Sequence, residues 1–421
     1  MFRFIYTLLL VFIAPILLIG LYKKKPGRPP FGARWKEHFG ITPRLPFTES
    51  PLWIHAVSVG EVIAASVIIK RLKQENPTLN ILVTTTTSTG AEQVAKLGEL
   101  VEHRYMPLDF PFAINGFLRA VKPISMLIME TELWPNTLHC VKKAGVPISI
   151  LNARLSERSC NKYQKVQPIF NSLAKHIDLV LCQNQSDAER FISLGIEEGR
   201  VKITGSVKFD ITISDSIKQQ GQALKSLIGP DRPVWIAAST HDGEDEQVLQ
   251  AHKTLLNTVP DALLILVPRH PERFSNVTDL ATSYNLKVVT RTSNQPVDSY
   301  TQVYIGDTMG EMLTLIGASD ICFMGGSLIG KKVGGHNVLE PAALEKPVIT
   351  GPSYFNFQEI TEMLLTARGA VVVNSPEELA NQVSTQITSK TLREQMGENA
   401  YSIVQSNRGA VSQVIQYISK V

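Results

Sequence analysis

The sequence predicts an α/β protein with two doubly wound domains, and three observations support this prediction. Short apolar segments rich in β-branched residues alternate with amphipathic segments along most of the chain. Continuous apolar strands joined by helices are typical of parallel sheets that are covered on both faces. The alternation stops at a polar stretch, residues 214–222, and then begins again, which indicates two sheets.

The predicted strands form two series. The first comprises residues 52–57, 81–85, 103–106, 124–129, 148–151, 179–182 and 201–204. The second comprises residues 234–238, 262–267, 287–290, 302–305, 321–324, 347–349 and 370–373. Helical patterns such as 61–74 and 186–194 lie between the strands. Ligands of such sheets bind beyond the carboxyl ends of the strands, so polar motifs at those ends are candidates for a site.

An apolar run at residues 4–22 precedes the first predicted domain, and Lys23, Lys24 and Lys25 follow it at once. Nineteen residues rising about 1.5 Å each span roughly 28 Å, close to the ~30 Å hydrocarbon core of a bilayer. Cytoplasmic flanks carry the lysine and arginine excess, so we expect the rest of the chain on the cytoplasmic side. A secretory signal peptide would place its charges before the apolar run. Pro15 leaves open a helix that enters only one leaflet.

The composition bounds the class of protein. Of the 421 residues, 44% are apolar and 19% are charged, which suffices for two domains with sizeable cores. The four cysteines have no paired spacing and indicate reduced thiols in a cytosolic protein. The net charge is only +4, and no basic stripe is interleaved with aromatic residues, so we expect no nucleic acid partner. The predicted division is a membrane anchor helix at 1–22, a basic juxtamembrane linker at 23–50, and domains at 51–212 and 213–421.

Glu61 follows the first predicted strand, after a tight turn through Gly60. Acidic residues favour the first turn of a helix because of the helix dipole, so the position has a structural explanation. The alternative is a general base that removes a proton from an incoming hydroxyl group. The residues by themselves leave both interpretations open.

Glu130 and Glu132 follow the fourth predicted strand, beside Trp134. They form either a capping cluster or a pair in which burial shifts the pKa of one carboxylate for acid–base chemistry. Lys208 follows the last strand of the first series. A lone lysine is usually a surface residue, but at a strand end it can neutralise negative charge that develops on a leaving phosphate.

The second series carries polar motifs at successive strand ends. Arg269 stands close to two prolines, and its guanidinium suits phosphate or carboxylate. Thr308 or Gly310 fits a helix N-cap, where free N–H groups bind anions. Two glycine pairs permit close approach of a nucleotide, and Glu340 can accept both ribose hydroxyls. No Walker loop or Gly-x-Gly-x-x-Gly fingerprint is present, but the motifs together predict a nucleotide site.

Metal binding has little support in the sequence. The acidic run at 242–245 leads into a helix, where its charges suit the helix dipole. No Asp-x-Asp motif stands at a strand end, and no histidine–cysteine cluster is present. We therefore expect chemistry without a metal or other cofactor, in which Arg269, Lys208 and a helix N-terminus share the phosphate charge.

Two doubly wound domains around a nucleotide cleft resemble the GT-B class of glycosyltransferases. Within that class the motifs look like those of the bacterial Kdo transferases, which move 3-deoxy-D-manno-octulosonic acid (Kdo) from CMP-Kdo to a lipid A precursor. The resemblance runs from the N-terminal run to about residue 360 and rests on residues 55–61, 129–136, 152–156, 204–210, 267–274, 306–311 and 334–340. The stretch 328–333 departs from this pattern, because it looks longer and more basic.

The resemblance implies a role for each motif. Glu61 would be the proton acceptor, while Glu130 and Lys208 would stabilise the transition state. The domain at 51–212 would bind the acceptor, and the domain at 213–421 would bind the CMP-sugar. The residues that would contact CMP are Pro268, Arg269, Met309, Gly310, Glu311, Asn337, Val338, Leu339 and Glu340.

These implications lead to one functional expectation. The chain would be an inverting GT-B enzyme of lipopolysaccharide core biosynthesis in the inner membrane of a Gram-negative bacterium, transferring Kdo from CMP-Kdo to lipid IVA. Its two domains would face a cleft and follow a transmembrane helix. One alternative is a membrane-associated GT-B enzyme that uses a UDP-sugar, such as an enzyme like lipid A disaccharide synthase. Another is a two-lobed binding protein without catalysis, which would normally carry a cleavable signal.

Overall fold

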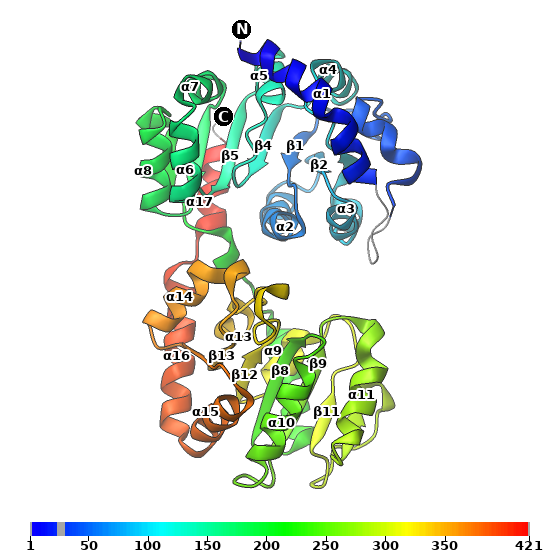
Figure 1. The fold of residues 1–421 in the computed structure, drawn as a ribbon, viewed down its shortest axis with the longest axis vertical. Coiled ribbons are helices and arrows are strands. Elements are labelled where there is room, and N and C mark those ends of the chain that lie inside the picture. The colour runs from blue at the N-terminus through cyan, green and yellow to red at the C-terminus, as the bar shows by residue number, and fades with distance from the viewer. Residues whose placement is uncertain (1, 23–29, 420–421) are drawn as a thin grey trace. The chain divides into compact units, whose positions relative to one another are not determined.

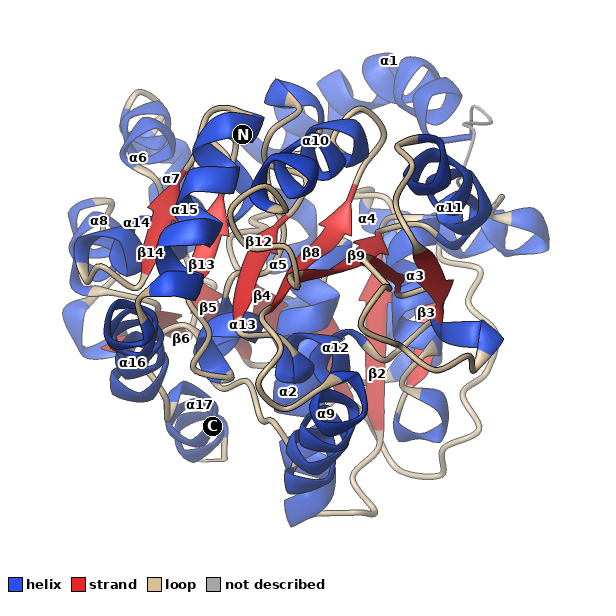
Figure 2. Ribbon diagram, turned by 90° about the horizontal axis from the view of Figure 1, so that it is seen from below, coloured by secondary structure: helices blue, strands red, loops and turns tan. Residues whose placement is uncertain are grey.

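The structure is a computed structural model that describes residues 2–22 and 30–419. The chain divides into two compact units, unit 1 (Met1–Asp210 with Arg408–Val421) and unit 2 (Ile211–Asn407). Each unit contains a 7-stranded sheet, and the neighbouring strands pair in parallel. Helices connect successive strands (Figure 1; Figure 2, strands red and helices blue). The predicted α/β class with two parallel sheets is therefore confirmed.

The sheet of unit 1 has the strand order β3-β2-β1-β4-β5-β6-β7. Its strands are β1 Leu52–His55, β2 Ile81–Thr85, β3 Glu102–Tyr105, β4 Ser125–Met129, β5 Ile148–Ala153, β6 Leu179–Cys182 and β7 Val201–Ile203. The order reverses at the neighbouring strands β1 and β4, whose register places Leu52 beside Ser125. In doubly wound sheets this switch point is where ligands bind.

Helices α2, α3, α6 and α8 of unit 1 begin at side-chain caps that the sequence supplies. Ser58, Thr87, Ser156 and Asn184 each accept a hydrogen bond from the main-chain N–H group three residues further on. The helices are α1 Phe2–Tyr22, η1 Gly32–Phe39, α2 Val59–Glu75, α3 Ser88–Ala95, η2 Gly98–Leu100, α4 Pro111–Val121, α5 Pro135–Lys143, α6 Glu157–Gln164, α7 Gln167–Ala174, α8 Gln185–Ser193, η3 Glu198–Arg200, η4 Val207–Phe209 and α17 Ala410–Ile418.

The sheet of unit 2 has the order β10-β11-β9-β8-β12-β13-β14, and its switch point lies between β8 and β12. Its strands are β8 Val234–Thr240, β9 Leu263–Pro268, β10 Val288–Thr290, β11 Val303–Ile305, β12 Ile321–Met324, β13 Val348–Thr350 and β14 Ala370–Val372. Its helices are α9 Asp215–Ile228, α10 Asp245–Leu255, η5 Pro271–Arg273, α11 Phe274–Ser283, η6 Arg291–Ser293, α12 Met312–Ala318, η7 Gly330–Lys332, α13 Leu339–Ala343, η8 Phe355–Phe357, α14 Gln358–Thr366, α15 Pro376–Thr388 and α16 Lys390–Ser406.

Every strand predicted from the sequence is present, with ends that differ by a few residues. The predicted helices at 61–74 and 186–194 are also present, as α2 and α8. Helix α2 begins earlier than predicted because Ser58 caps it. Apolar strand runs are reliable because both faces of these sheets are covered, as the fully buried pattern of β1, β2 and β9 shows.

The C-terminal helix α17 belongs to unit 1, whereas the sequence predicted a second domain that continues to 421. Asp210 holds the start of this helix, because its carboxylate accepts hydrogen bonds from the N–H groups of Gly409 at 2.6 Å and Val411 at 2.5 Å. Val411 and Val414 are buried in the same apolar cluster as Ile68 of α2. The chain thus crosses from unit 1 to unit 2 and returns, which an uninterrupted helical pattern at the C-terminus does not indicate.

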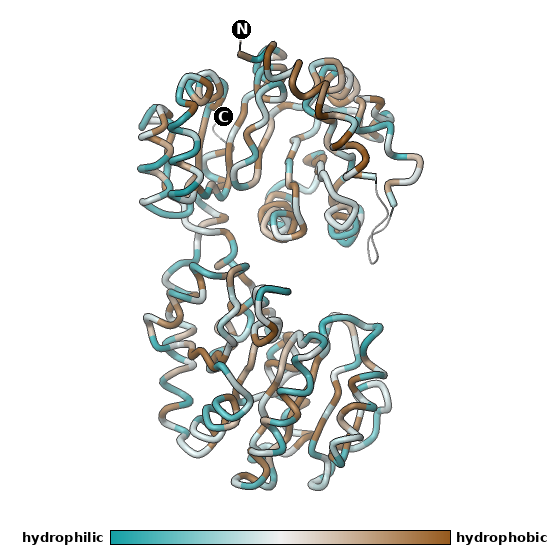
Figure 3. The backbone as a smooth tube through the Cα atoms, in the orientation of Figure 1, coloured by the Kyte–Doolittle hydropathy of each residue, from teal (hydrophilic) through white to brown (hydrophobic). Residues whose placement is uncertain are grey.

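Helix α1 packs against unit 1 (Figure 3, brown). The side-chain amide of Asn136 in α5 donates a hydrogen bond to Thr7 Oγ1 at 2.9 Å. Near the other end of α1, the Tyr22 hydroxyl lies 2.7 Å from His38 Nδ1. In the described part of the chain, no helix combines the length and the apolarity needed to cross a membrane. The predicted transmembrane anchor at 1–22 is therefore unsupported. The helix that forms there makes hydrogen bonds with other parts of unit 1 near both of its ends.

Part of the predicted linker is packed structure. Gly32–Phe39 forms the 3-10 helix η1. Glu37 within it is 3% exposed and accepts a hydrogen bond from the main-chain N–H of Tyr105 in β3 at 2.6 Å. The predicted linker at 23–50 is thus corrected for these residues, since a buried carboxylate needs fixed partners. The basic run predicted within 23–29 lies outside the described residues.

The Asp210 cap leads to a stability prediction. Asp210→Ala should lower the free energy of unfolding by about 1–2 kcal/mol, because two N–H groups at the start of α17 lose their acceptor. Urea denaturation measures this change. Asp231→Ala, which alters an exposed turn residue, is the control and should change stability by less than about 0.5 kcal/mol. A value for Asp210→Ala as small as the control would show that α17 does not depend on this cap.

Candidate active site

Glu61 lies in the first turn of α2, beyond the carboxyl end of β1, and is 7% exposed. Its carboxylate accepts hydrogen bonds from the main-chain N–H of Val57 at 2.8 Å and from the Ser58 hydroxyl at 2.8 Å. In return, Ser58 Oγ accepts a hydrogen bond from the N–H of Glu61 at 3.3 Å. These reciprocal bonds resemble a capping box, so the structural explanation of Glu61 is confirmed as far as it goes.

The environment of Glu61 also changes its acidity. Burial raises the pKa of Glu61 to about 6, although the hydrogen bonds from Val57 and Ser58 lower it, and the nearby charges of Glu130 and Glu132 raise it further. A carboxylate with this pKa is a stronger base than an ordinary glutamate and is still mostly ionised at pH 7.5. A perturbed carboxylate at a strand end is a candidate functional group. Capping and proton transfer are compatible roles for one side chain.

Glu130 and Lys208 form an ion pair, as expected for two residues of one active site. Glu130 follows β4 with a φ of 57°, a backbone conformation that is uncommon outside glycine and often marks functional positions. Its Oε1 atom lies 3.6 Å from Nζ of Lys208, and both side chains are partly exposed. Glu61 and Glu130 follow the paired strands β1 and β4, and helix α2, which carries Glu61, contacts η4, which carries Lys208. The three predicted catalytic residues therefore lie on neighbouring elements beside the switch point of unit 1.

Contacts at both ends of the short helix η4 position Lys208. It lies in η4, whose first N–H group, from Val207, donates to Oδ1 of Asn152 at 3.1 Å. Asn152 is fully buried in β5 and has a φ of 51°. Asp210, at the other end of η4, is held by α17. Contacts at both ends of η4 therefore fix the main chain that carries Lys208. From this position its ammonium group reaches Glu130.

In unit 2, two histidines meet across the switch point. His241 follows β8 and His336 follows β12, and their Nε2 atoms are 2.8 Å apart. The rings are stacked with centroids 5.0 Å apart and an interplanar angle of 9°. His270 contacts His241 edge-on, with ring centroids 5.4 Å apart.

Both histidines are neutral at pH 7. Burial, together with the neighbouring charges of Arg269 and His270, lowers the pKa of His241 to about 4 and that of His336 to about 3. One ring must then donate its Nε2 proton to the other. The Arg269 side chain is exposed and has no hydrogen bond or ion pair within the described residues. A free guanidinium beside two imidazoles that can gain protons suits an anionic ligand.

A buried carboxylate shapes the loop that leads to His336. Glu244 is 0% exposed and accepts hydrogen bonds from the N–H groups of Gly326 at 2.6 Å, Ser327 at 2.9 Å and Leu328 at 3.0 Å. From the sequence, we predict that the acidic run at 242–245, which contains Glu244, interacts with the helix dipole. The structure corrects this interpretation, because Glu244 also organises the glycine turn after β12.

The predicted N-cap of α12 is wrong. Glu311 occupies that position, not Thr308 or Gly310, because Glu311 is held by Arg291 at 3.0 Å and by the Thr308 hydroxyl at 2.6 Å. Met309, in the same loop, is 66% exposed. The proposed contacts of Met309, Gly310 and Glu311 with a nucleotide stay predictions.

The remaining predicted donor residues differ in what they can offer a ligand. Pro268, Val338 and Leu339 are buried, so their side chains belong to the core and only their main chain remains for contacts. The amide of Asn337 donates to Glu340 at 3.2 Å, and burial raises the pKa of Glu340. Asn337 follows His336 directly in the sequence, and the positive charge of Arg269 lowers the pKa of Glu340, opposing the effect of burial.

The sequence reasoning missed the His241–His336 pair and the positioning role of Asn152. The two histidines are 95 residues apart and form no sequence motif. The signal that could have paired them is their place after the two central strands of one doubly wound sheet. Within residues 2–22 and 30–419, no three or more His, Cys, Asp or Glu side chains are grouped so that they could hold a metal ion. Metal-free chemistry stays a prediction.

Comparisons with known proteins agree with these motifs. Residues 33–211 match the family model of 3-deoxy-D-manno-octulosonic-acid transferase (kdotransferase), and residues 245–403 match glycosyl transferases group 1. The 3-deoxy-D-manno-octulosonic acid transferase of Haemophilus influenzae is 42% identical over 424 residues, covering 99% of this chain and 98% of the relative. The protein of the same name from Bordetella pertussis is 30% identical and covers 98% of both chains.

A solved structure supports the fold. The UDP-GlcNAc 2-epimerase from Neisseria meningitidis aligns with a TM-score of 0.57 at 15% identity, covering 88% of this chain and 100% of that chain. At this identity the likeness concerns the arrangement of the elements and not the activity. The relative from Haemophilus influenzae, by contrast, matches along nearly the whole length. The chain is therefore a glycosyltransferase that belongs to the 3-deoxy-D-manno-octulosonic acid transferase family.

Proposed function

We propose that the chain is an inverting glycosyltransferase that moves Kdo from CMP-Kdo to the lipid A precursor lipid IVA in lipopolysaccharide biosynthesis. The observation that supports the proposal is the ion pair of Glu130 with Lys208 on elements that adjoin the helix of Glu61, in a chain 42% identical to a Kdo transferase. Membership of the family indicates that the transferred sugar is Kdo. The site contains a candidate base, Glu61, together with a second carboxylate, Glu130, and a cation, Lys208.

Unit 1 would activate the acceptor. Glu61 would accept the proton of a sugar hydroxyl of the acceptor, and the raised pKa makes this transfer favourable near neutral pH. The hydroxyl oxygen would attack the anomeric carbon of Kdo as the bond to the phosphate of CMP breaks on the opposite face, which inverts the configuration. Lys208, held by Glu130, would stabilise negative charge on the departing phosphate.

Unit 2 would hold the donor. CMP-Kdo carries one phosphate and one sugar carboxylate. Arg269 offers one positive charge to this anion, and the neutral His241–His336 pair offers ring nitrogens that can donate hydrogen bonds or gain a proton. The arriving anion would raise the pKa of the histidine pair, so donor binding is coupled to proton uptake. The positive charge of Arg269, and that of the histidine pair once it has gained a proton, supports the expectation that no divalent cation is required.

Helix α1 would lie on the inner membrane. Its Phe4, Phe12, Ile16 and Ile19 side chains are 70–74% exposed, an unusual density of apolar groups on one helix face. A helix whose other face packs on the protein suits the interface between headgroups and acyl chains. This position would bring unit 1 close to a lipid acceptor whose sugar head lies at the membrane surface.

The proposal as a whole is tested with the product of the reaction. The chain should convert CMP-Kdo and a tetraacylated lipid A precursor in anionic vesicles into a product heavier by one or more Kdo units, detected by mass spectrometry, and it should sediment with the vesicles. Full activity should remain after exhaustive chelation. CMP should raise the melting temperature more than UDP does. Transfer from a UDP-sugar with stabilisation by UDP would instead favour a lipid A disaccharide synthase-like enzyme.

The role of Glu61 leads to a prediction about rate and pH. Glu61→Gln should lower kcat by about 10²–10⁴-fold, because an amide of the same shape cannot accept a proton. In the native chain kcat should fall about tenfold per pH unit below about pH 6, where Glu61 becomes protonated. Steady-state kinetics from pH 5 to 8 measure both effects. Glu75→Gln, at the far end of the same helix, is the matched control and should retain the native profile.

A stability measurement separates this effect from misfolding. The folded-state pKa of Glu61, about 6, lies above its ordinary 4.5, so this group contributes most stability when protonated and loses it as the pH rises through 6. Glu61→Gln has no charge to bury. Its stability relative to the native chain should therefore rise by up to about 2 kcal/mol between pH 4.5 and 7.5. Equal turnover of Glu61→Gln and native protein would remove Glu61 from the base role.

The anion site in unit 2 leads to a binding prediction. Arg269→Ala should weaken CMP binding by about 10–100-fold, the size expected for loss of charge-assisted hydrogen bonds. His336→Gln should abolish the proton uptake that accompanies CMP binding, measured by calorimetry in buffers of different ionisation enthalpy. Lys253→Ala removes an exposed cation elsewhere in unit 2 and should bind CMP normally. Native affinity in Arg269→Ala would contradict the donor site.

A further inference from the structure

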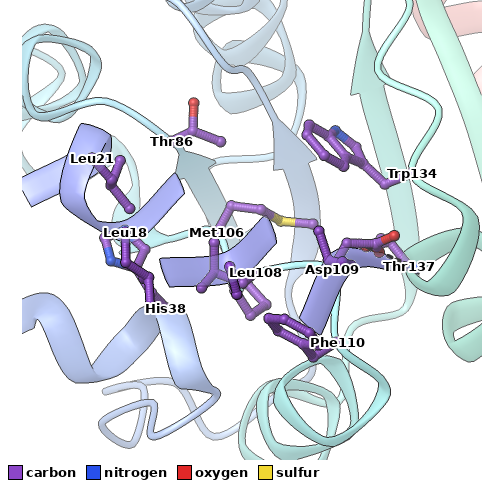
Figure 4. A pocket seen from close by; sticks show the side chains of 13 residues that line it. Leu18, Leu21, His38, Thr86, Met106, Leu108, Asp109, Phe110, Trp134 and Thr137 are labelled. Carbon is purple, nitrogen blue, oxygen red and sulfur yellow. Dashed lines mark hydrogen bonds between the residues drawn. The ribbon is translucent and has the colours of Figure 1, made fainter. Parts of the chain in front are cut away.

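Unit 1 contains a cavity of about 250 Å³ between α1 and the loops beyond the sheet (Figure 4). Leu10, Ala14, Leu18 and Leu21 of α1 line one side of it. They recur at the helical period and form the half-buried face of that helix. The opposite walls come from segments 106–110 and 134–137, after β3 and β4, and from residue 86 after β2.

Asp109 and His38, two polar residues that line the cavity, already have hydrogen-bond partners within the protein. The Asp109 carboxylate accepts hydrogen bonds from the N–H groups of Asn136 at 3.1 Å and Thr137 at 2.6 Å, and from the Thr137 hydroxyl at 2.7 Å. His38 contacts the Tyr22 hydroxyl, and burial lowers the pKa of His38 to about 4, so its ring is uncharged at pH 7. A cavity with such walls is poor for water and suits hydrocarbon.

Hydrogen bonds link the wall of the cavity to Glu61. Thr86 lines the cavity, and its hydroxyl donates to the carbonyl of Val57 at 3.4 Å, while the N–H of Val57 is bonded to Glu61. Trp134 also lines the cavity, and its indole N–H donates to Glu132 at 3.0 Å. A ligand in the cavity would therefore contact Thr86, which is linked to the candidate base through Val57.

We propose that this cavity binds one acyl chain of the lipid acceptor. The proposal rests on the proposed function, because it takes the acceptor to be a lipid whose sugar head reacts at Glu61. The volume lies below the roughly 300–1,000 Å³ of ordinary small-molecule pockets, so it suits a single chain and not a whole lipid. Helix α1 also carries an exposed apolar face, so the helix that lines the cavity is the one suited to contact the membrane from which the chain would come. Helix α1 thus forms one wall of the acceptor site.

Filling the cavity tests this proposal. Ala14→Trp should raise the KM for a tetraacylated acceptor at least about tenfold, since the indole takes the space of several methylene groups. The KM for a short-chain analogue of the acceptor and for CMP-Kdo should stay within about twofold of native. Leu9→Trp puts the same ring on the 55%-exposed, opposite side of α1 and should keep the native preference for long chains.

A second measurement locates the chain directly. An acceptor with a diazirine at the end of one acyl chain should label α1 or segments 106–110 and 134–137 on irradiation, as mapped by mass spectrometry. Ala14→Trp should lose this labelling and Leu9→Trp should keep it. Labelling elsewhere, or an equal rise in KM for long- and short-chain acceptors, would overturn the proposal. The proposal would also be overturned if Ala14→Trp lowered the melting temperature but left the preference for long chains unchanged. That result would mean that side chains of the protein, and not an acyl chain, normally fill the space that the indole takes.

The two proposals fail in different ways. If native protein transfers Kdo equally well to both acceptors and Ala14→Trp changes neither, the acyl site is wrong and the Kdo transferase function stands. If native protein transfers Kdo to neither acceptor, the proposed function is wrong, and the acyl site that depends on it is wrong as well.

Discussion

Parallel pairing is the constraint on which the rest of this structure depends. A parallel sheet needs a crossover after every strand, and where the strand order reverses, the two central crossovers diverge. In unit 1 this happens between β1 and β4, and in unit 2 between β8 and β12. Glu61 and Glu130 follow the first pair of strands, and His241 and His336 follow the second. Each unit thus brings distant polar residues together by its strand order.

The candidate base shows how one side chain can be both structural and reactive. The hydrogen bonds that make Glu61 a helix cap hold its carboxylate in place, and they oppose the effect of burial on its pKa. Burial prevails, so the pKa lies above the ordinary value. The positive charge of Lys208 balances the negative charge of Glu130 and not that of Glu61, because Lys208 forms its ion pair with Glu130. The cluster therefore keeps one carboxylate able to accept a proton.

Helix α1 has two apolar faces with different surroundings. Leu10, Ala14 and Leu18 face the cavity of unit 1, while Phe12 and Ile16 are exposed. Hydropathy averaged along the segment does not distinguish these faces. A helix that is apolar all round is typical of a membrane span, but it is equally suited to lie between a protein surface and a lipid surface. The hydrogen bonds of Thr7 with Asn136 and of Tyr22 with His38 fix which face of α1 contacts the rest of unit 1.

The sequence by itself determined the α/β class, all of the strands, and the polar residues that follow them, since apolar runs and turn residues are local signals. Motif order was also enough to indicate the family. The tertiary structure alone decided that Glu130 meets Lys208, that His241 meets His336, and that α17 returns to Asp210. These contacts join residues far apart in the chain, and they exist only because the order of strands within each sheet, which no local pattern encodes, places the ends of those strands side by side.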